Sequence, residues 1–456
     1  MAHRRRGSVA RTIDVDSLLD NGALRGLPLL VVICTTMVLI LDGLDIQVIA
    51  FAAPALMTEF GIERKALGPV LAAALLGMSI GSFTLGPAGD RWGRRPIILL
   101  SGLMFGASTI LASTSQSLWQ LAGWRLVTGI GLGGALPNSA ALMAEYAPQR
   151  WRSMLIAVTI VGVPIGGMIG AEIAAQVIPA HGWRTMFVIA GALPIVALVA
   201  MQFVLPESPR YLAACAGRQR ELAALMNRYA GTTVCAPEDA FTTGLFGTAG
   251  QRPGVGALFA DVYRRDTIAL WIIFGTNLFS VYTFFSWTPV ILKSLGLEEA
   301  TAIRGSLVYN LAGTIGTLLS AWAMSRIGSR RPLTVVALIA MAGLFWLWHI
   351  TSSSAATGMA PGVVALMIGF ALAGFGINAT QVGAYTVGAH VYATDVRSTG
   401  VGAAAGLGRI GGIVSAFAGG ALLTWFGGPG FFIALSVFVV LTLTGILLVR
   451  KHVPSA

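Results

Sequence analysis

The stretch of sequence that decides the fold is Gly86-Pro87-Ala88-Gly89-Asp90-Arg91-Trp92-Gly93-Arg94-Arg95. It is short, rich in glycine and basic, and an apolar run lies on each side of it, at residues 66–88 and 96–114. A membrane-spanning helix needs about 20 mostly apolar residues. The pattern therefore predicts two membrane helices joined by a short charged loop.

The same pattern extends outward over the whole chain. Hydrophobic residues make up 55% of it and charged residues only 11%, whereas a soluble domain carries roughly 25% charged residues. The sequence therefore predicts an all-α membrane protein with the lipid bilayer as its solvent. The twelve predicted transmembrane helices are 27–56, 66–88, 96–114, 118–145, 153–178, 183–205, 267–292, 301–325, 332–351, 361–391, 397–424 and 429–449.

The formal charge of +11 is explained by the loops between the apolar runs. If the N-terminus is cytoplasmic, the outer segments hold only Arg64, Lys65, Arg184, Lys293 and Arg304, and almost all other loop cations lie inside. The positive-inside rule then predicts that both termini are cytoplasmic, in a bacterial inner membrane. A membrane accounts for these charges, so we expect no nucleic-acid partner.

The chain divides into two halves of six predicted helices. The segment Ala144–Ser153, which closes the fourth apolar run, aligns at one constant offset with Ala389–Ser398, which closes the tenth. This repeat favours two pseudo-symmetric six-helix bundles with a central site between them. The expected segments are a cytoplasmic N-terminal segment (1–26), an N-terminal bundle (27–205), a cytoplasmic central loop that serves as a linker (206–266), a C-terminal bundle (267–450) and a cytoplasmic tail (451–456).

The stretch quoted first resembles the loop signature of the major facilitator superfamily, G-x-x-x-D-R-x-G-R-R, at every defined position. A degraded copy without the aspartate stands at 325–331, and the segment 125–134 (R-x-x-x-G-x-G-x-G-G) is similar to another signature of that superfamily. The resemblance implies a two-bundle fold that works by alternating access. It also implies a role in proton transfer or packing for Arg125, and conformational control by Gly86, Asp90, Arg91, Gly93, Arg94 and Arg95.

Within that superfamily, Asp42-Gly43-Leu44-Asp45 resembles the D-G-x-D motif in the first helix of the aromatic acid:proton symporters. Further matching pieces are Leu136-Pro137-Asn138, Pro206-Glu207-Ser208 and Arg397-Ser398-Thr399-Gly400, so the likeness covers nearly the whole chain. It implies proton-coupled import of an aromatic carboxylate of the benzoate, hydroxybenzoate or phenylpropanoid acid class.

Asp42 and Asp45 are also the residues that elementary physical chemistry singles out. Their spacing of three places them on one helix face, about 22 Å along a helix that begins near Leu27. This is past the middle of a bilayer core about 30 Å thick. A carboxylate at that depth must face a polar interior, find a partner or take up a proton. The functional interpretation is proton coupling; the alternative is that one aspartate only pairs with an arginine.

Two arginines lie inside predicted helices. Arg409, near midplane depth, offers a planar fork that matches a carboxylate, so it either binds the substrate or forms a permanent ion pair with Asp42 or Asp45. Arg125 either assists proton transfer or forms a structural ion pair, and the partner expected from depth is Glu172.

Glu145 and His390 end corresponding helices on the inner side. We expect Glu145 to join Arg91, Arg94 or Arg152 in a cytoplasmic network that assists coupling, and His390 to be a structural residue. Buried amides need partners and aromatic rings stack on aromatic substrates, although rings also fill ordinary helix contacts. The expected substrate-binding residues beside Arg409 are Asn277, Tyr282, Phe285, Asn378, Gln381 and Tyr385.

The sequence contains no zinc-ligand spacing and no phosphate-binding loop. We therefore expect a transporter that is driven by an ion gradient and is not an enzyme, without metal or cofactor. We also expect it to be a monomer. Efflux, or transport of a non-aromatic organic acid or a sugar, is the alternative within transport. A membrane receptor with a transporter fold is the alternative from another class.

Overall fold

A computed structural model describes residues 11–215, 217–236, 238–242, 255–358 and 360–455. Long helices account for most of it, and the only strands in this part are two of three residues each. The long helices are α2 (Leu27–Phe60), α3 (Gly68–Trp92), α4 (Arg94–Ala112), α5 (Leu118–Tyr146), α6 (Arg152–Val204), α9 (Arg264–Ser294), α10 (Glu299–Ile327), α11 (Arg330–Thr357), α12 (Val363–Val391) and α13 (Thr394–Leu448).

These ten helices are all long and apolar enough to cross a membrane. Two of them, α6 and α13, contain 53 and 55 residues and would each extend about 80 Å at 1.5 Å per residue. Each is divided by a glycine with non-helical backbone, Gly182 (φ 80°) or Gly427 (φ 63°). Each is thus two successive spans, and the prediction of twelve transmembrane helices is confirmed.

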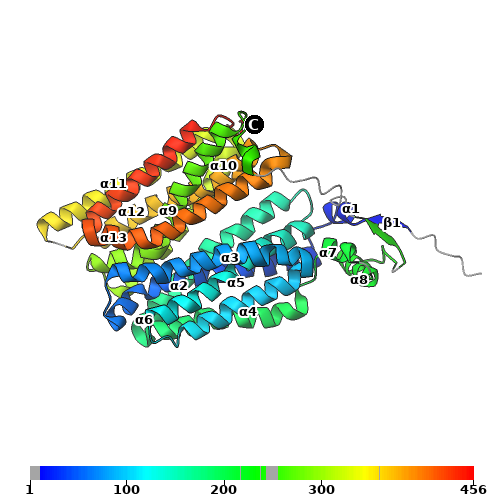
Figure 1. Cartoon of the computed structure of the whole chain (residues 1–456), viewed down its shortest axis with the longest axis horizontal. Coiled ribbons are helices and arrows are strands. Elements are labelled where there is room, and N and C mark those ends of the chain that lie inside the picture. The colour runs from blue at the N-terminus through cyan, green and yellow to red at the C-terminus, as the bar shows by residue number, and fades with distance from the viewer. Residues whose placement is uncertain (1–10, 216, 237, 243–254, 359, 456) are drawn as a thin grey trace, which may run out of the picture.

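The helices form two bundles, α2–α6 and α9–α13, which lie one above the other in Figure 1. A small layer of short elements lies at one end of the first bundle, around α1 (Val15–Asp20) and α8 (Gln219–Ala230). We call this the cap end and the opposite one the distal end. Toward the distal end one buried apolar cluster includes residues of both bundles, among them Phe51 and Trp287, so the bundles are packed together there.

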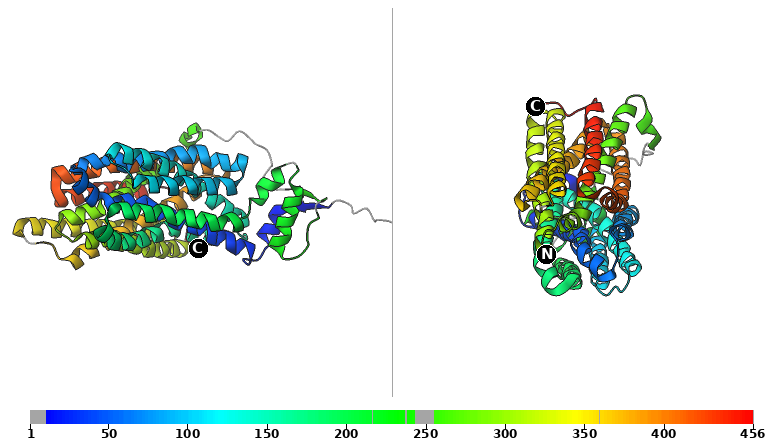
Figure 2. Two further views of the ribbon diagram at one scale, coloured as in Figure 1. Left: turned by 90° about the horizontal axis from the view of Figure 1, so that it is seen from below. Right: turned by 90° about the vertical axis from the view of Figure 1, so that its left-hand side faces the viewer.

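The central loop contains folded elements, whereas the sequence predicts only a linker between the two bundles. Strand β1 (Thr12–Asp14) pairs in parallel with β2 (Ala240–Thr242), and α1 packs with α7 (Pro209–Ala214) and α8. We call these five elements the cap layer (Figure 2). Its core joins Val15 and Leu19 to Leu222 and Met226. These apolar residues are far apart in the sequence and none belongs to a long apolar run, which is why the composition of the loop did not indicate a folded layer.

The loop within the Gly86–Arg95 stretch is shorter than the sequence predicts. Helix α3 continues to Trp92 and α4 begins at Arg94, so Gly93 alone makes the turn. Its φ of 102° is strained for any residue with a side chain, and a Cβ there would lie 2.3 Å from Oε2 of Glu207. Glycine at this position thus permits both the abrupt turn and the approach of Glu207.

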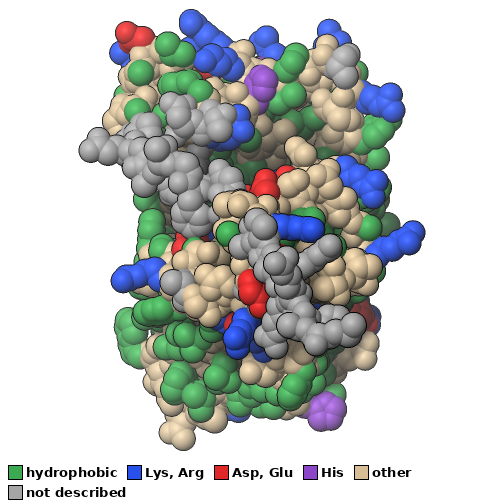
Figure 3. Space-filling model, turned by 90° about the vertical axis from the view of Figure 1, so that its right-hand side faces the viewer, with side chains coloured by type: hydrophobic (Ala, Val, Ile, Leu, Met, Phe, Trp, Pro, Cys, Tyr) green, Lys and Arg blue, Asp and Glu red, His purple; other side chains and the backbone are tan. Residues whose placement is uncertain are grey.

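The cap end is the basic end of the molecule. Figure 3 looks directly at this end and shows Lys and Arg side chains spread over both bundles. This distribution is the three-dimensional counterpart of the loop charges that predict a cytoplasmic face.

Candidate transport site

Asp45 is neutralised within the first bundle. It is fully buried, and one guanidinium nitrogen of Arg125 in α5 donates to its Oδ2 at 2.9 Å. The other donates to the backbone carbonyl of Asp45 at 3.1 Å, and the Thr109 hydroxyl of α4 donates to Oδ1 at 2.5 Å. Both charges are completely removed from solvent, so breaking the pair would leave an uncompensated buried charge, which is strongly destabilising.

The expected pairing of Arg125 with Glu172 is wrong. Glu172 instead accepts two hydrogen bonds from Arg304 of α10, at 3.1 and 2.8 Å, and both side chains of this pair are partly exposed. Depth in the membrane suggested Glu172, but depth does not fix the direction in which a side chain points. Arg125 points into its own bundle, whereas Glu172 points toward the second bundle.

Asp42 has a different environment, although it shares a helix face with Asp45. It is also fully buried, yet within the described residues neither of its carboxylate oxygens has a hydrogen-bond partner. The charges that act on it are those of Asp45 and of Arg409 in the second bundle. A buried carboxylate without donors is unstable as an anion, so this position suits a group that takes up a proton.

Arg409 lies in α13 of the second bundle. Its charge interacts with Asp42 of α2, with Tyr282 of α9 and with Tyr385 of α12. Among the described residues no ion pair joins Arg409 to Asp42 or to Asp45, and Asp45 is instead held by Arg125. The guanidinium is half-buried and keeps donors for a ligand.

Aromatic and amide side chains surround this arginine. Tyr282 packs against the buried clusters of both bundles and meets the Phe285 ring edge to face at 6.1 Å. Tyr385 meets the Phe274 ring edge to face at 4.8 Å and is 41% exposed. Such rings offer faces and edges for stacking with a ligand ring.

The three amides differ in how much hydrogen-bonding capacity they retain. Asn277 is buried and donates to Gln381 Oε1 at 2.8 Å and to the Ile377 carbonyl at 3.2 Å. Asn378 donates to the carbonyl of Gly374, in its own helix. Gln381 is half-buried beside Tyr385.

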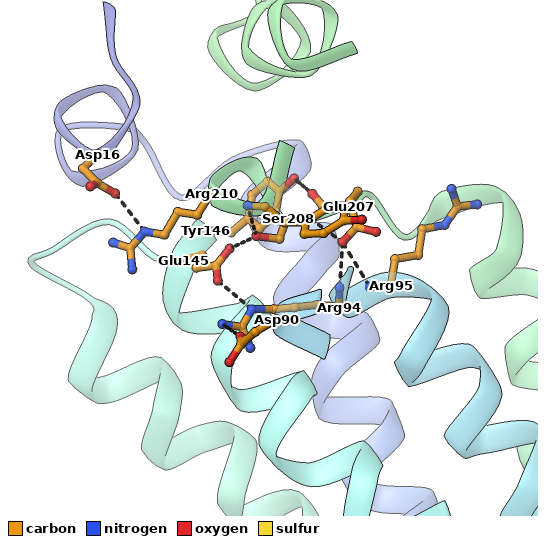
Figure 4. Close-up of polar contacts among 10 residues, drawn as sticks. Asp16, Asp90, Arg94, Arg95, Glu145, Tyr146, Glu207, Ser208 and Arg210 are labelled. Carbon is orange, nitrogen blue, oxygen red and sulfur yellow. Dashed lines mark hydrogen bonds and ion pairs between the residues drawn. The ribbon is translucent and has the colours of Figure 1, made fainter. Parts of the chain in front are cut away.

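A second polar cluster lies where α3, α4 and α5 meet the cap layer (Figure 4). Arg94 Nε donates to Glu145 Oε1 at 2.7 Å, and Ser208 donates to the other oxygen of Glu145. Glu207 accepts hydrogen bonds from the backbone N–H groups of Arg94 and Arg95 at 2.9 and 3.2 Å. All these residues belong to the first bundle and the segment that follows it.

The remaining predicted gate residues lie around this cluster. Asp90, near the end of α3, pairs with Arg94, at the start of α4, at 3.0 Å across the Gly93 turn, and Arg91 is exposed. Arg152, an expected partner of Glu145, pairs with Asp20 of the cap layer instead. His390 is exposed at the cap end of α12.

Two polar pairs that the sequence did not indicate bridge the bundles. Gln47 of α2 and Asn310 of α10 exchange hydrogen bonds of 2.9 and 3.5 Å, and both are buried. The second pair is Glu172 with Arg304. Beyond them, at the distal end, lies a cavity of about 640 Å³ lined by both bundles. Gln47 and Asn310 were recognisable as amides in apolar helices, which need partners, but nothing in the sequence paired them.

Replacing Arg125 with lysine should lower the thermal stability of the protein although the charge is kept. An ammonium group has no planar fork with which to reach the carboxylate and the carbonyl of Asp45 together, and a lost buried hydrogen bond costs about 1–3 kcal/mol. Thermal unfolding in detergent measures the effect. Arg304→Lys, in a partly exposed pair, is the matched control; equal melting temperatures for the two variants would contradict the assignment.

Comparison with known proteins identifies the family and the fold. Residues 35–365 match the model of the Major Facilitator Superfamily. The gallate transporter of Pseudomonas putida is 32% identical over 90% of this chain and 89% of its own length. A 4-hydroxybenzoate transporter of Acinetobacter baylyi is 32% identical over 90% and 88%. The inward-open xylose transporter of Escherichia coli superposes with a TM-score of 0.71 at 17% identity, over 93% of this chain and 97% of that one, which shows the shared fold.

These findings confirm the resemblance inferred from the sequence motifs. They also identify the protein as a transporter and not an enzyme, of a kind that an ion gradient drives without a cofactor. The chain belongs to the Major Facilitator Superfamily.

Proposed function

We propose that this protein imports an aromatic carboxylate together with a proton. The observation that carries the proposal is the buried carboxylate of Asp42, which lacks hydrogen-bond donors and lies within the electrostatic reach of Arg409 from the other bundle. An anionic substrate that occupies Arg409 removes a compensating positive charge from the surroundings of Asp42. Proton uptake by Asp42 then offsets that loss, which couples the two ligands.

The predicted substrate-binding residues each take a role in this proposal. Arg409 binds the carboxylate, while Tyr282, Phe285 and Tyr385 contact the ring. Gln381, held by Asn277, bonds a ring substituent, and Asn378 shapes the site. Asp45 and Arg125 position α2 so that Asp42 stands at the bundle interface. The names of the gallate and 4-hydroxybenzoate transporters support an aromatic acid as the substrate class.

The two bundles supply the means of alternating access. The distal end is held by the packed apolar cluster and by the Gln47–Asn310 and Glu172–Arg304 pairs. We assign the cap end to the cytoplasm of a bacterial cell, with both termini there. The structure then corresponds to a state that is closed to the outside. The cluster of Arg94, Glu145 and Ser208 is available to contact the second bundle when the inner side closes.

The deciding experiment is uptake of radiolabelled 4-hydroxybenzoate or gallate by vesicles that contain the protein. We expect accumulation above equilibrium when the pH outside is lower, and its collapse on addition of an uncoupler. Vesicles without the protein are the control. Accumulation that an uncoupler leaves unchanged would refute proton coupling, and active extrusion of the same acids would refute import.

Replacing Asn310 with valine should open the distal end. The substitution leaves the buried Gln47 amide without its partner. This destabilises the state in which the distal end is closed by about 1–3 kcal/mol. This shifts the equilibrium toward distal opening roughly fivefold or more. Electron–electron distances between spin labels at Thr58→Cys and Ser294→Cys, which line the distal cavity from opposite bundles, report the shift.

Thr314→Val is the matched control for that measurement. The Thr314 hydroxyl bonds the carbonyl of Asn310 within α10 and does not reach the first bundle. Identical distance distributions in the Asn310 variant and the unsubstituted protein would show that the amide pair does not hold the distal end closed.

A further inference from the structure

We propose that the junction between the cap layer and the start of α2 is a binding site for the phosphate headgroup of an anionic membrane lipid. A cavity of about 400 Å³ lies there, formed by the segment that leads into α2 and by the last turns of α8. Among its lining residues are Arg25, Arg228 and Tyr229. The cavity is separate from the transport site, which lies about the middle of the bundles.

The charges around this cavity suit a phosphate group. Arg25 and Arg228 are both exposed, and neither forms an ion pair with a described residue. Within the described part of the chain, no Asp or Glu lines the cavity. Asp20, whose charge acts on Tyr229, is paired with Arg152. Two guanidinium groups therefore face the cavity with their donors available, and guanidinium forks match phosphate oxygens.

The tyrosine in the cavity wall adds no negative charge. Burial, together with the charge of Asp20, raises the pKa of Tyr229 to about 12, so its hydroxyl stays protonated at neutral pH. That hydroxyl donates to the carbonyl of Leu19. Helix α2 begins at Leu27 without a side-chain cap, so the positive end of its dipole lies at the cavity wall.

The position of the cavity points to a lipid rather than to a free anion. On α2, the exposed apolar side chains Leu29, Ile33 and Met37 follow one another at intervals of four residues. They form a stripe on one helix face that begins two residues after the cavity wall. A phospholipid lying along this stripe places its acyl chains on α2 and its phosphate between Arg25 and Arg228. Basic pockets at this membrane depth hold anionic headgroups.

The test uses the full-length purified protein in nanodiscs or detergent, with phosphatidylglycerol compared with phosphatidylcholine. We expect native mass spectrometry of the unsubstituted protein to retain phosphatidylglycerol in preference to phosphatidylcholine. We also expect that phosphatidylglycerol raises the melting temperature and that inorganic phosphate or glycerol 3-phosphate at millimolar concentration does not. An equal response to inorganic phosphate would overturn the lipid assignment in favour of a free-anion site.

Substitution locates the site. Arg25→Gln and Arg228→Gln should each weaken phosphatidylglycerol binding about fivefold. Arg220→Gln is the matched control, since Arg220 is an exposed arginine of the same helix α8 that does not line the cavity. Unchanged binding in the double variant, or an equal loss in the control, would overturn the proposal. The lipid preference of the unsubstituted protein keeps the test decisive even if the double variant fails to fold.

Discussion

Replacing Asp42 with asparagine should abolish uphill accumulation of substrate while leaving exchange of substrate across the membrane intact. The amide has nearly the shape of the carboxyl group but cannot bind or release a proton. Import of one proton with one carboxylate moves no net charge, so a pH difference of one unit, worth about 1.4 kcal/mol, supports roughly a tenfold concentration ratio. That ratio should fall to about one. Counterflow in vesicles loaded with unlabelled substrate measures the exchange that remains.

Asp45→Asn is the matched control, three residues away on the same helix. It leaves the buried guanidinium of Arg125 without its counter-ion, so we expect a protein of reduced thermal stability. If the Asp42 variant still accumulates substrate and a stable Asp45 variant does not, the proton is carried by Asp45 and the assignment is reversed.

Replacing Arg409 with alanine should raise the concentration of aromatic acid needed for half-maximal uptake about thirtyfold or more. Truncating one partner of a buried, hydrogen-bonded charge pair costs about 2–5 kcal/mol. Arg409→Lys should recover only part of this loss, since an ammonium keeps the charge without the fork. Concentration-dependent uptake of the labelled acid measures the change.

A neutral analogue separates carboxylate recognition from a general loss of structure. The amide of the same aromatic acid has no negative charge, so its binding, measured by protection against thermal unfolding, should be affected far less by Arg409→Ala. Equal losses for the acid and the amide, or none for either, would show that Arg409 does not recognise the carboxylate.

The aspartate pair shows how far sequence reasoning reaches into the candidate site. The spacing and the depth of Asp42 and Asp45 indicated a shared face near the membrane midplane, and the structure places both in the buried part of α2. The sequence left open whether they act alike. The structure separates them, because Thr109 and Arg125 occupy Asp45 while Asp42 stays without donors.

The Arg125–Glu172 pairing shows where such reasoning fails. Both residues lie inside apolar runs, and the carboxylate was chosen by depth alone. Which side chains meet depends on the rotation of each helix about its axis and on its neighbours. Close approach of α2 to α6 is one such determinant, since a Cβ on Gly43 would lie 1.9 Å from the Val163 carbonyl oxygen. Contacts of this kind are settled by packing over the whole bundle.

By itself, the sequence determined that this is a twelve-helix membrane transporter of a known superfamily, which end is basic and which charges lie at midplane depth. These properties follow from composition summed over some twenty residues and from short motifs, because transfer into lipid is decided segment by segment. The tertiary structure alone decided which charge pairs with which, that a single glycine makes the turn of the Gly86–Arg95 stretch, and that the central loop folds with the N-terminal segment. Those outcomes depend on contacts between residues far apart in the chain, which no local pattern specifies.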